Sequence, residues 1–307
     1  MSKLEERMVV DEKYDKMRID SVIPLLNTKI SRSLAQSLIK EGKILVNGKA
    51  VKVSAKVSAG DEIFIPENAE KEVAESLVAE EIPISILYED EDIIVVNKPK
   101  DMVVHPALGN HHGTLVNALL GHSELSDING EFRPGIVHRL DKNTTGVLVI
   151  AKNNFAHQEI AKQIQNRTTK KIYVALVKGI IKEEHGVIDM PIGRHPTDRK
   201  KMAVVKGGRE AHTEFTVLKR FKEGYTYIEI ELKTGRTHQI RVHMSHIGFP
   251  VVGDDVYSSG KNPFGVTSQM LHAKKLGFVH PTKNEYMEFE APIPEEFERV
   301  LNGLTIL

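Results

Sequence analysis

The stretch from residue 135 to residue 152 contains a single acid, Asp141, in a polar insert between two apolar runs. These runs, Ile136-Val137 and Val147 to Ala151, predict strands because β-branched residues fit a pleated sheet better than a helix. Residues 144–146, Thr-Thr-Gly, predict a turn or bulge between them. A carboxylate on a loop between rigid elements can be aimed at a substrate, so Asp141 is a candidate catalytic group. The alternative is a surface turn in which the aspartate caps its own backbone.

Two further segments carry polar groups that the core of a sheet does not require. Residues 170–179 predict a strand containing Tyr173, whereas residues 234–243 place Arg236 in a loop and Arg241 on a predicted helix. Taken alone, Tyr173 is more typical of a core position. Likewise, Arg241 alone is explained by a nearby carboxylate or carbonyl.

The composition indicates a soluble globular protein. No apolar run approaches the roughly 20 residues that cross a bilayer, and the acid-containing amino terminus does not resemble a secretory signal. The absence of cysteine excludes disulfides, thiol nucleophiles and cysteine-ligated metals. His238 and His243 are five residues apart, which does not stack them on a helix, so no metal site is expected. We expect a cytoplasmic protein.

The formal net charge of zero hides a strong segregation of charge. Residues 16–66 contain nine Lys and Arg against four Asp and Glu, a net of plus five. Residues 67–92 contain ten acids and one lysine, a net of minus nine, whereas residues 194–209 contain six bases and one acid. The pattern favours two basic faces joined by a solvated acidic linker.

The first basic block coincides with a pattern typical of a compact domain. Apolar spacing predicts one helix from residue 19 to residue 26 and another that begins after an N-cap at Ser31 and ends at Gly42. Strands are predicted at residues 43–46, 50–53 and 61–66, the first two joined by a hairpin turn at Asn47-Gly48. These residues, with Arg18, Asp20 and Arg32, resemble the RNA-binding domain named after ribosomal protein S4. The resemblance implies that Arg32, at a helix N-terminus that attracts phosphate, and Lys43 contact RNA; Lys29 and Lys40 could extend the surface.

The remainder predicts an α+β domain with a largely antiparallel sheet, because hairpin signals outnumber helices. The expected boundaries are residues 14–68 for the first domain, 69–83 for the acidic linker and 84–307 for the second domain. Expected strands of the second domain cover residues 85–89, 93–97, 171–177, 211–221, 225–232 and 270–279, and expected helices cover residues 114–120, 155–165 and 238–246.

Several ordered motifs of the second domain resemble the RluA/RluD family of RNA pseudouridine synthases. They are His138-Arg139-Leu140-Asp141, Asn97-Lys98-Pro99, Val104-His105-Pro106, Gly248-Phe249-Pro250, Gly253-Asp254, residues 170–179, residues 199–202 and 208–211, and residues 234–243. Departures are small: Asn143 and Thr145 stand where many relatives have Asp and Ser. Both keep turn-forming, hydrogen-bonding character.

The resemblance implies a role for each matching residue. Asp141 corresponds to the catalytic aspartate, and Arg241 to the basic residue that pairs with it through paired hydrogen bonds. Tyr173 corresponds to the tyrosine that packs on the flipped uracil and is proposed to act in proton removal, and Arg139 to the arginine that displaces the target base. His138 and Arg236 are expected to bind the substrate.

Pseudouridine formation breaks the bond between ribose and uracil nitrogen, rotates the base and rejoins it through a ring carbon. Because nothing is oxidised and no group is imported, no metal or organic cofactor is expected. The resemblance implies a substrate in large-subunit ribosomal RNA, and a monomer suffices. Two alternatives remain: a non-catalytic RNA-binding or ribosome-assembly protein, and a glycosidase, which lacks its usual second catalytic carboxylate here.

Overall fold

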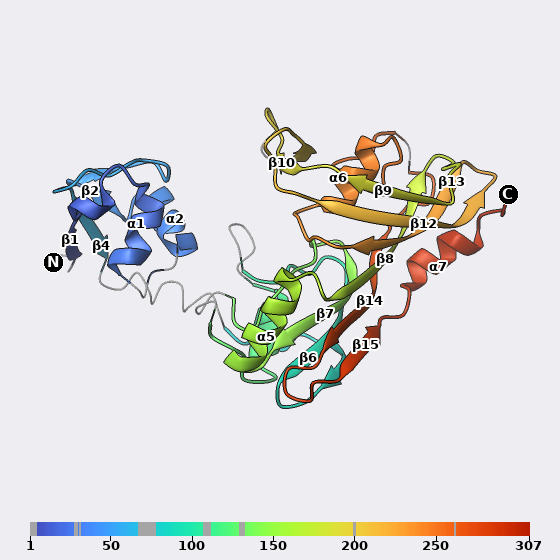
Figure 1. Ribbon diagram of the computed structural model, residues 1–307, viewed down its shortest axis with the longest axis horizontal. Coiled ribbons are helices and arrows are strands. Elements are labelled where there is room, and N and C mark those ends of the chain that lie inside the picture. The colour runs from blue at the N-terminus through green and yellow to red at the C-terminus, as the bar shows by residue number, and fades with distance from the viewer. Residues whose placement is uncertain are drawn as a thin grey trace. The chain divides into compact units, whose positions relative to one another are not determined.

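The chain folds into two compact units (Figure 1). The computed structural model describes residues 5–27, 30, 32–66, 78–106, 112–128, 133–198, 201–260 and 262–307. Most of the expected acidic linker lies outside these residues, so the domain limits stay predictions. Within the described ranges, no helix is long and apolar enough to cross a membrane.

The smaller unit is a helix pair packed on a four-stranded sheet of order β1-β4-β2-β3. Its elements are β1 (Glu5–Val9), the 3-10 helix η1 (Glu12–Tyr14), α1 (Ile19–Leu26), α2 (Arg32–Lys40), β2 (Leu45–Val46), β3 (Lys49–Ala50) and β4 (Glu62–Pro66). Both helices and the turn at Asn47-Gly48 are confirmed, and both turn residues adopt positive φ. The predicted strand at residues 50–53 is wrong beyond Ala50, and β1 was not predicted. The N-cap prediction for Ser31 and the surface role of Lys29 fall outside the described residues.

A buried carboxylate ties the two helices of this unit together. Asp20 is fully buried and accepts hydrogen bonds from Arg18, Arg32 and Gln36. The bonds to Arg18, above all, lower the pKa of Asp20 to about 2. Buried charges of this kind are stable only when they are fully paired. Around this network pack the apolar side chains of the unit's core, including Ile19, Ile23, Leu34, Leu38 and Ile63.

The larger unit is built on one nine-stranded sheet (Figure 1). The strand order is β5-β6-β7-β14-β8-β13-β12-β9, with β15 paired to β14, and every pairing except β7 with β14 is antiparallel. The strands are β5 (Ser85–Glu89), β6 (Ile93–Lys98), β7 (Thr145–Ala151), β8 (Lys170–Lys178), β9 (His185–Asp189), β12 (His212–Phe221), β13 (Tyr225–Leu232), β14 (Leu271–Val279) and β15 (Tyr286–Glu290). A separate hairpin consists of β10 (Ile192–Arg194) and β11 (Met202–Val204). The predicted α+β class is confirmed.

Among the described residues, four helices accompany this sheet: α4 (Leu115–Leu120), α5 (Asn154–Gln165), α6 (Gln239–His246) and α7 (Glu295–Asn302). Thr114 caps α4, as its residue type predicts, and its hydroxyl accepts from the backbone of Asn117. Helix α5 covers β7 and β14, whereas α6 lies against β11 and β12. The predictions missed β9, β10, β11, β15 and α7.

The strand prediction around residue 136 is wrong. Ile136 lies in an isolated bridge to Ile150 and in no described strand. The predicted turn at residues 144–146 lies earlier, where the Thr144 amide donates to the Asp141 carbonyl oxygen. Thr145 and Gly146 instead begin β7, the strand that directly follows the loop containing Asp141.

Strand β7 meets β14 over only two residue pairs, Thr145 with His272 and Gly146 with Ala273. Gly146 has φ of +117°, and a Cβ placed there would lie 2.1 Å from the Ala273 carbonyl oxygen. Only glycine permits both this backbone conformation and this approach. The junction therefore fixes the start of β7 and, with it, the end of the Asp141 loop.

Replacing Gly146 with alanine should lower the free energy of unfolding by about 3 kcal/mol, because overpacking adds to backbone strain. Denaturant unfolding measures this loss. The matched control is Gly224→Ala, whose glycine has φ of +85° but no atom within 4 Å of its Cβ position. It should cost about 1 kcal/mol. Equal losses in the two variants would contradict a packing role for Gly146.

Candidate active site

A pocket of about 420 Å³ opens in the larger unit. It is lined by the Asp141 loop, the end of α5, the start of β8, the end of β13 and the loop that leads into α6. Six of the eight predicted site residues line it: Asp141, Tyr173, Arg241, Arg139, Arg236 and His138. Residues more than 100 positions apart in the chain thus meet around one cavity.

Asp141 is held by a guanidinium that is itself buried. Arg241 is 4% exposed, and its Nη1 donates to Oδ2 of Asp141 at 3.1 Å. The expected paired hydrogen bonds go instead to Asp254, which accepts from Nε at 2.6 Å and from Nη2 at 3.0 Å. Arg241 therefore makes its bidentate hydrogen bonds to Asp254 and donates a single hydrogen bond to Asp141.

Asp254 is saturated with donors, which makes it a fixed support for Arg241. The backbone amides of Val256 and Tyr257 both donate to its Oδ1. Burial alone would raise the pKa of Asp254, but the hydrogen bonds and charge of Arg241, together with the two backbone amides, hold the pKa below the ordinary value. Burial alone would lower the pKa of Arg241, but the hydrogen bonds and charge of Asp254, with those of Asp141, raise it above the ordinary value. The pair is therefore ionised, so the positive charge beside Asp141 is permanent.

A buried lysine supports the Asp141 loop from behind. Lys98 is fully buried and donates to the carbonyl oxygens of Pro99, Met102 and Lys142, the last at 2.9 Å. Burial lowers the pKa of Lys98 to about 7, against the attraction of Asp141. The ammonium connects the end of β6 to the residue that directly follows Asp141, so it helps to set the direction of the loop.

Tyr173 and His138 form apolar and polar parts of the pocket wall. Tyr173 is 9% exposed, and burial followed by the charge of Asp141 raises its phenol pKa. The phenol therefore keeps its proton at neutral pH, and its ring forms a packing surface in the pocket wall. His138 accepts a hydrogen bond from the Val149 amide through Nε2, and burial lowers its pKa to about 3. As a neutral ring, it links the Asp141 loop to β7.

His238 is a functional candidate that the sequence did not reveal. Its Nε2 lies 3.9 Å from Oδ2 of Asp141, and its Nδ1 lies 2.9 Å from the hydroxyl of Tyr257. That hydroxyl accepts from the Met202 amide, so its own proton is free to go to Nδ1. This arrangement assigns the remaining ring proton to Nε2, on the Asp141 side. His238 was predicted within a helix, but it precedes α6 in a left-handed conformation with φ of 56°.

The loop before α6 is locked by Gln239. Its Oε1 accepts from the Thr234 hydroxyl and the Arg236 amide, and its Nε2 donates to the His212 carbonyl oxygen. Arg236 donates through Nε to the carbonyl oxygen of Glu210. Arg139, by contrast, is exposed. Arg236 is thus held in place by this hydrogen bond before any substrate binds, whereas Arg139 is an exposed side chain at the rim of the pocket.

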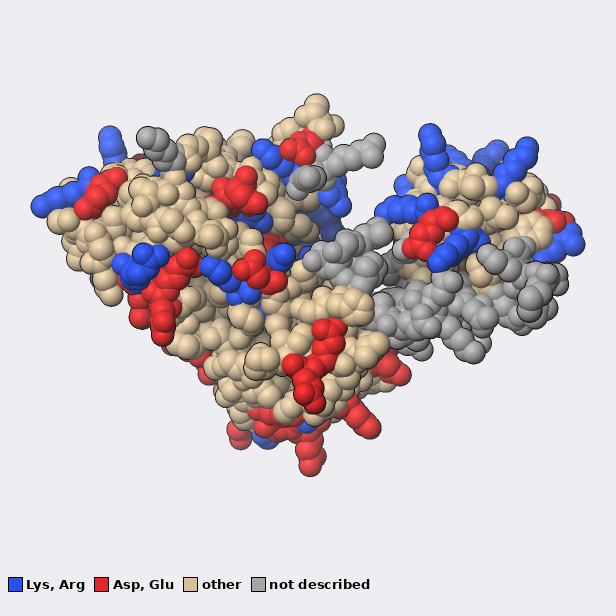
Figure 2. Space-filling view, turned by 180° about the vertical axis from the view of Figure 1, so that it is seen from behind, with Lys and Arg blue, Asp and Glu red and all other residues tan. Residues whose placement is uncertain are grey.

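The other two predicted site residues, Arg32 and Lys43, lie in the smaller unit. Arg32 donates twice to Asp20, and Lys43 pairs with Glu41 at 2.9 Å. Figure 2 shows basic side chains over much of the described surface of this unit, where the exposed lysines are Lys13, Lys16, Lys40, Lys43, Lys49, Lys52 and Lys56. Arg199 and Lys200, from the motif at residues 199–202, fall outside the described residues.

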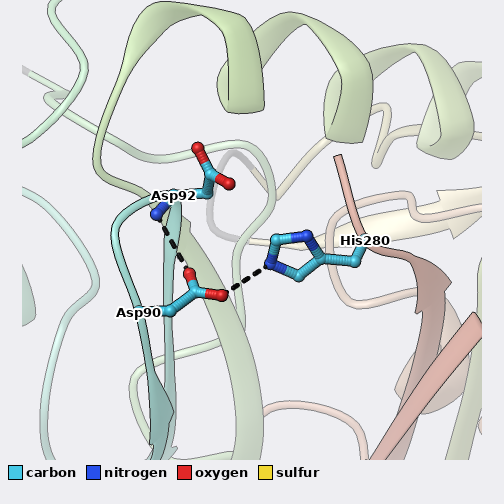
Figure 3. Close-up of side chains that lie close together, drawn as sticks. All are labelled: Asp90, Asp92 and His280. Carbon is cyan, nitrogen blue, oxygen red and sulfur yellow. Dashed lines mark hydrogen bonds and ion pairs between the residues drawn. The ribbon is translucent and has the colours of Figure 1, made fainter. Parts of the chain in front are cut away.

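One group of possible metal ligands is found among the described residues, and it lies outside the pocket. Asp90, Asp92 and His280 converge at the turn between β5 and β6 (Figure 3). However, Oδ2 of Asp90 already accepts from Lys283 at 2.8 Å and Tyr88 at 2.7 Å, and lies 2.9 Å from Nε2 of His280. Since a lysine ammonium already neutralises this carboxylate, the cluster is an ion-pair network that joins two turns. His243 hydrogen bonds to the hydroxyl of Thr213 and to the carbonyl oxygen of Met190.

Comparison with known proteins gives consistent similarities. A family model described as RNA pseudouridylate synthase matches residues 92–246, and an S4 domain model matches residues 17–63. A protein of Aquifex aeolicus named uncharacterized RNA pseudouridine synthase is 48% identical over 314 residues, covering 98% of each chain. Ribosomal large subunit pseudouridine synthase D of Pseudomonas aeruginosa is 44% identical over 299 residues, covering 94% of this chain and 92% of its own.

A solved structure has the same fold as most of the chain. Human RNA pseudouridylate synthase domain containing 1 superimposes with a TM-score of 0.58 at 30% identity. The match covers 75% of this chain and 91% of the human one.

Replacing Asp254 with asparagine should destabilise the protein by about 3 kcal/mol, because it leaves the buried Arg241 without its bidentate partner. The rate of product formation at saturating substrate should also fall, since Arg241 no longer holds Asp141 in place. Thermal unfolding and single-turnover kinetics measure the two effects. Asp255→Asn is the matched control: Asp255 is exposed and lies 3.8 Å from the same guanidinium. A variant of Asp254 as stable and active as this control would contradict the supporting role.

The difference in unfolding free energy between wild type and Asp254→Asn should decrease as the pH is lowered. Because folding lowers the pKa of Asp254, its stabilising contribution is complete above the ordinary value of 3.8 and is lost as pH falls through the folded value. The difference measured by denaturant unfolding should therefore shrink below pH 3.8. A difference that grows on acidification would contradict this sign.

Proposed function

The chain belongs to the RNA pseudouridylate synthase family and isomerises uridine in RNA to pseudouridine, and we propose that Asp141 is its catalytic carboxylate. The observation that carries the proposal is the hydrogen bond from buried Arg241 to Asp141 inside the pocket. Of the pocket's lining residues, Asp141 alone has a carboxylate side chain. A substrate held there would meet one negative charge surrounded by fixed donors.

The proposed chemistry requires one carboxylate next to the ribose of the target uridine. Asp141 either attacks the sugar carbon as the uracil leaves, or removes a proton from the sugar. In both routes the released uracil stays bound, turns and bonds to the sugar through its ring carbon. This step displaces Asp141 from the sugar in the first route and lets Asp141 return the sugar proton in the second. The ring carbon loses its proton as the uracil nitrogen gains one, so the reaction is an isomerisation. Because no electron or group enters, the proposal includes no metal and no organic cofactor.

Access to the glycosidic bond requires the uridine to leave its base stack, which costs a few kcal/mol. We assign two side chains to offset this cost. The ring of Tyr173 forms a platform for the extruded base, and Arg139, exposed at the rim, fills the place that the base leaves. His138 and Arg236 complete the substrate-binding wall.

The proposed substrate is large-subunit ribosomal RNA. This step rests on the names of relatives, such as the Pseudomonas aeruginosa protein, together with the S4 match and the exposed lysines of the smaller unit. Arg32 and Lys43 are assigned to RNA contact in the same proposal. We propose that the protein acts as a monomer in the cytoplasm.

Purified protein should convert uridine to pseudouridine in precursor large-subunit RNA without any added cofactor, and Asp141→Asn should lower the rate by roughly 1,000-fold or more. The amide keeps the shape of the side chain but has no charge with which to act. Because isomerisation leaves the mass unchanged, a sequencing signature specific for pseudouridine is the measurement. Filter binding should show that the variant still binds RNA.

Asp255→Asn, which removes an exposed carboxylate beside the same site, should convert uridine at the wild-type rate. Activity of Asp141→Asn equal to this control would overturn the assignment of Asp141. Release of free uracil by the wild type would indicate a glycosidase in place of an isomerase.

A further inference from the structure

Lys171 is a buried cation that pairs with no described residue. It lies on β8, is 8% exposed and lines the pocket. Its neighbours on the strand differ: Lys170 is exposed and pairs with Glu288, whereas Lys178 donates to the Ser259 carbonyl oxygen. Among the described residues, Lys171 makes no such hydrogen bond or ion pair. Leaving a charge buried and unpaired costs several kcal/mol, so the position is not explained by stability.

Two arginines reach the same wall of the pocket from other elements. Arg167 follows α5, and Arg236 lies in the loop before α6. Burial, followed by the charges of these two arginines, lowers the pKa of Lys171. The three cations are therefore close enough to repel one another.

A single acidic residue, Glu210, organises the two arginines. Its carboxylate accepts from both terminal nitrogens of Arg167 at 2.8 Å, and its carbonyl oxygen accepts from Nε of Arg236 at 2.7 Å. The side chain of Glu210 is 61% exposed, so it does not neutralise Lys171 inside the pocket. Arg236 uses only Nε in this contact, which leaves its two terminal nitrogens for a ligand.

The position of Lys171 relative to Tyr173 indicates what the ligand is. The two residues are two positions apart on β8, so their side chains lie on the same face of the strand, about 6.6 Å apart along it. Lys171 therefore lies two residues along β8 from Tyr173, whose ring we assign to the extruded base. The part of an RNA substrate that is anionic and adjacent to a base is its phosphate. Lysine and arginine are the side chains that bind phosphate most strongly.

We propose that Lys171 and Arg236 form a phosphate subsite that binds an RNA phosphate next to the target uridine. The inference rests on the proposed function, since it places the base on Tyr173. The subsite adds affinity in ground state and transition state alike, because the phosphate takes no part in the bond changes. Its physical role is to fix the register of the RNA strand on the pocket.

The test compares Lys171→Met with Lys170→Met, which removes a neighbouring exposed charge. The RNA is a stem-loop containing a uridine that the wild type converts. Lys171→Met should raise the Kd roughly tenfold. It should also reduce the salt dependence of binding by about 0.7 in log–log slope, the value for one phosphate contact on a single strand. Lys170→Met should change neither quantity.

Two further readouts separate this subsite from other roles. At saturating enzyme, the single-turnover rate of Lys171→Met should stay within about twofold of wild type, as expected for uniform binding. A lower rate with unchanged Kd would place Lys171 at the departing uracil and overturn the phosphate subsite. The melting temperature of Lys171→Met should be no lower than that of wild type; a clear loss would assign Lys171 a structural role and overturn the subsite.

Stem-loops with one neutral methylphosphonate linkage, placed 5′ or 3′ of the uridine, identify the contact directly. One linkage should weaken binding of the wild type more than binding of Lys171→Met, because the variant has already lost one of the two cations that contact the phosphate. If both linkages weaken the two proteins equally, the subsite is wrong. Conversion of the unmodified stem-loop by wild type is scored separately, so a failure of the proposed function is distinct from a failure of this inference.

Discussion

The burial of Arg241 between two carboxylates is the constraint on which the site depends. A guanidinium that is 4% exposed needs a partner for nearly every donor, and Asp254 supplies a bidentate one. The other terminal nitrogen, Nη1, donates to Asp141. Because Asp254 is in turn held by two backbone amides, the orientation of Asp141 depends on the fold of residues 254–257 as much as on its own loop. Rigid support of this kind spares the reaction the cost of orienting a charged group.

The sheet positions the Asp141 loop at the short parallel pairing between β7 and β14. Strands β7 and β14 pair over two residues only, and the Asp141 loop ends where that contact begins. Gly146 allows the close approach, while Lys98 and His138 connect the loop to β6 and β7. Tyr173 comes from β8 on the other side of β14. The pocket is thus bounded by both halves of the sheet, which explains why its residues are scattered through the sequence.

Local sequence patterns predicted much of the fold but only part of the site. Alternation in β12 and β13, and the turn at Asn47-Gly48, are properties of neighbouring residues and were confirmed. The strand at Ile136-Val137 was wrong because β-branched residues also suit a buried loop, where tertiary packing decides. Asp254 was noticed as a motif residue without a role, and Lys171 and His238 were not singled out for substrate binding. Asp254 acts through Arg241, 13 positions away, and His238 contacts Tyr257, 19 positions away, and the spacing of residues does not reveal such contacts.

The central claim is that Asp141, oriented by Arg241, converts uridines in large-subunit ribosomal RNA. The most direct measurement is a pseudouridine map of that RNA from cells lacking the gene and from the same cells expressing either wild type or Asp141→Asn. The account predicts that specific pseudouridines disappear with the gene and return only with the wild-type protein. Pseudouridines that persist without the gene, or that return with the asparagine variant, would contradict it.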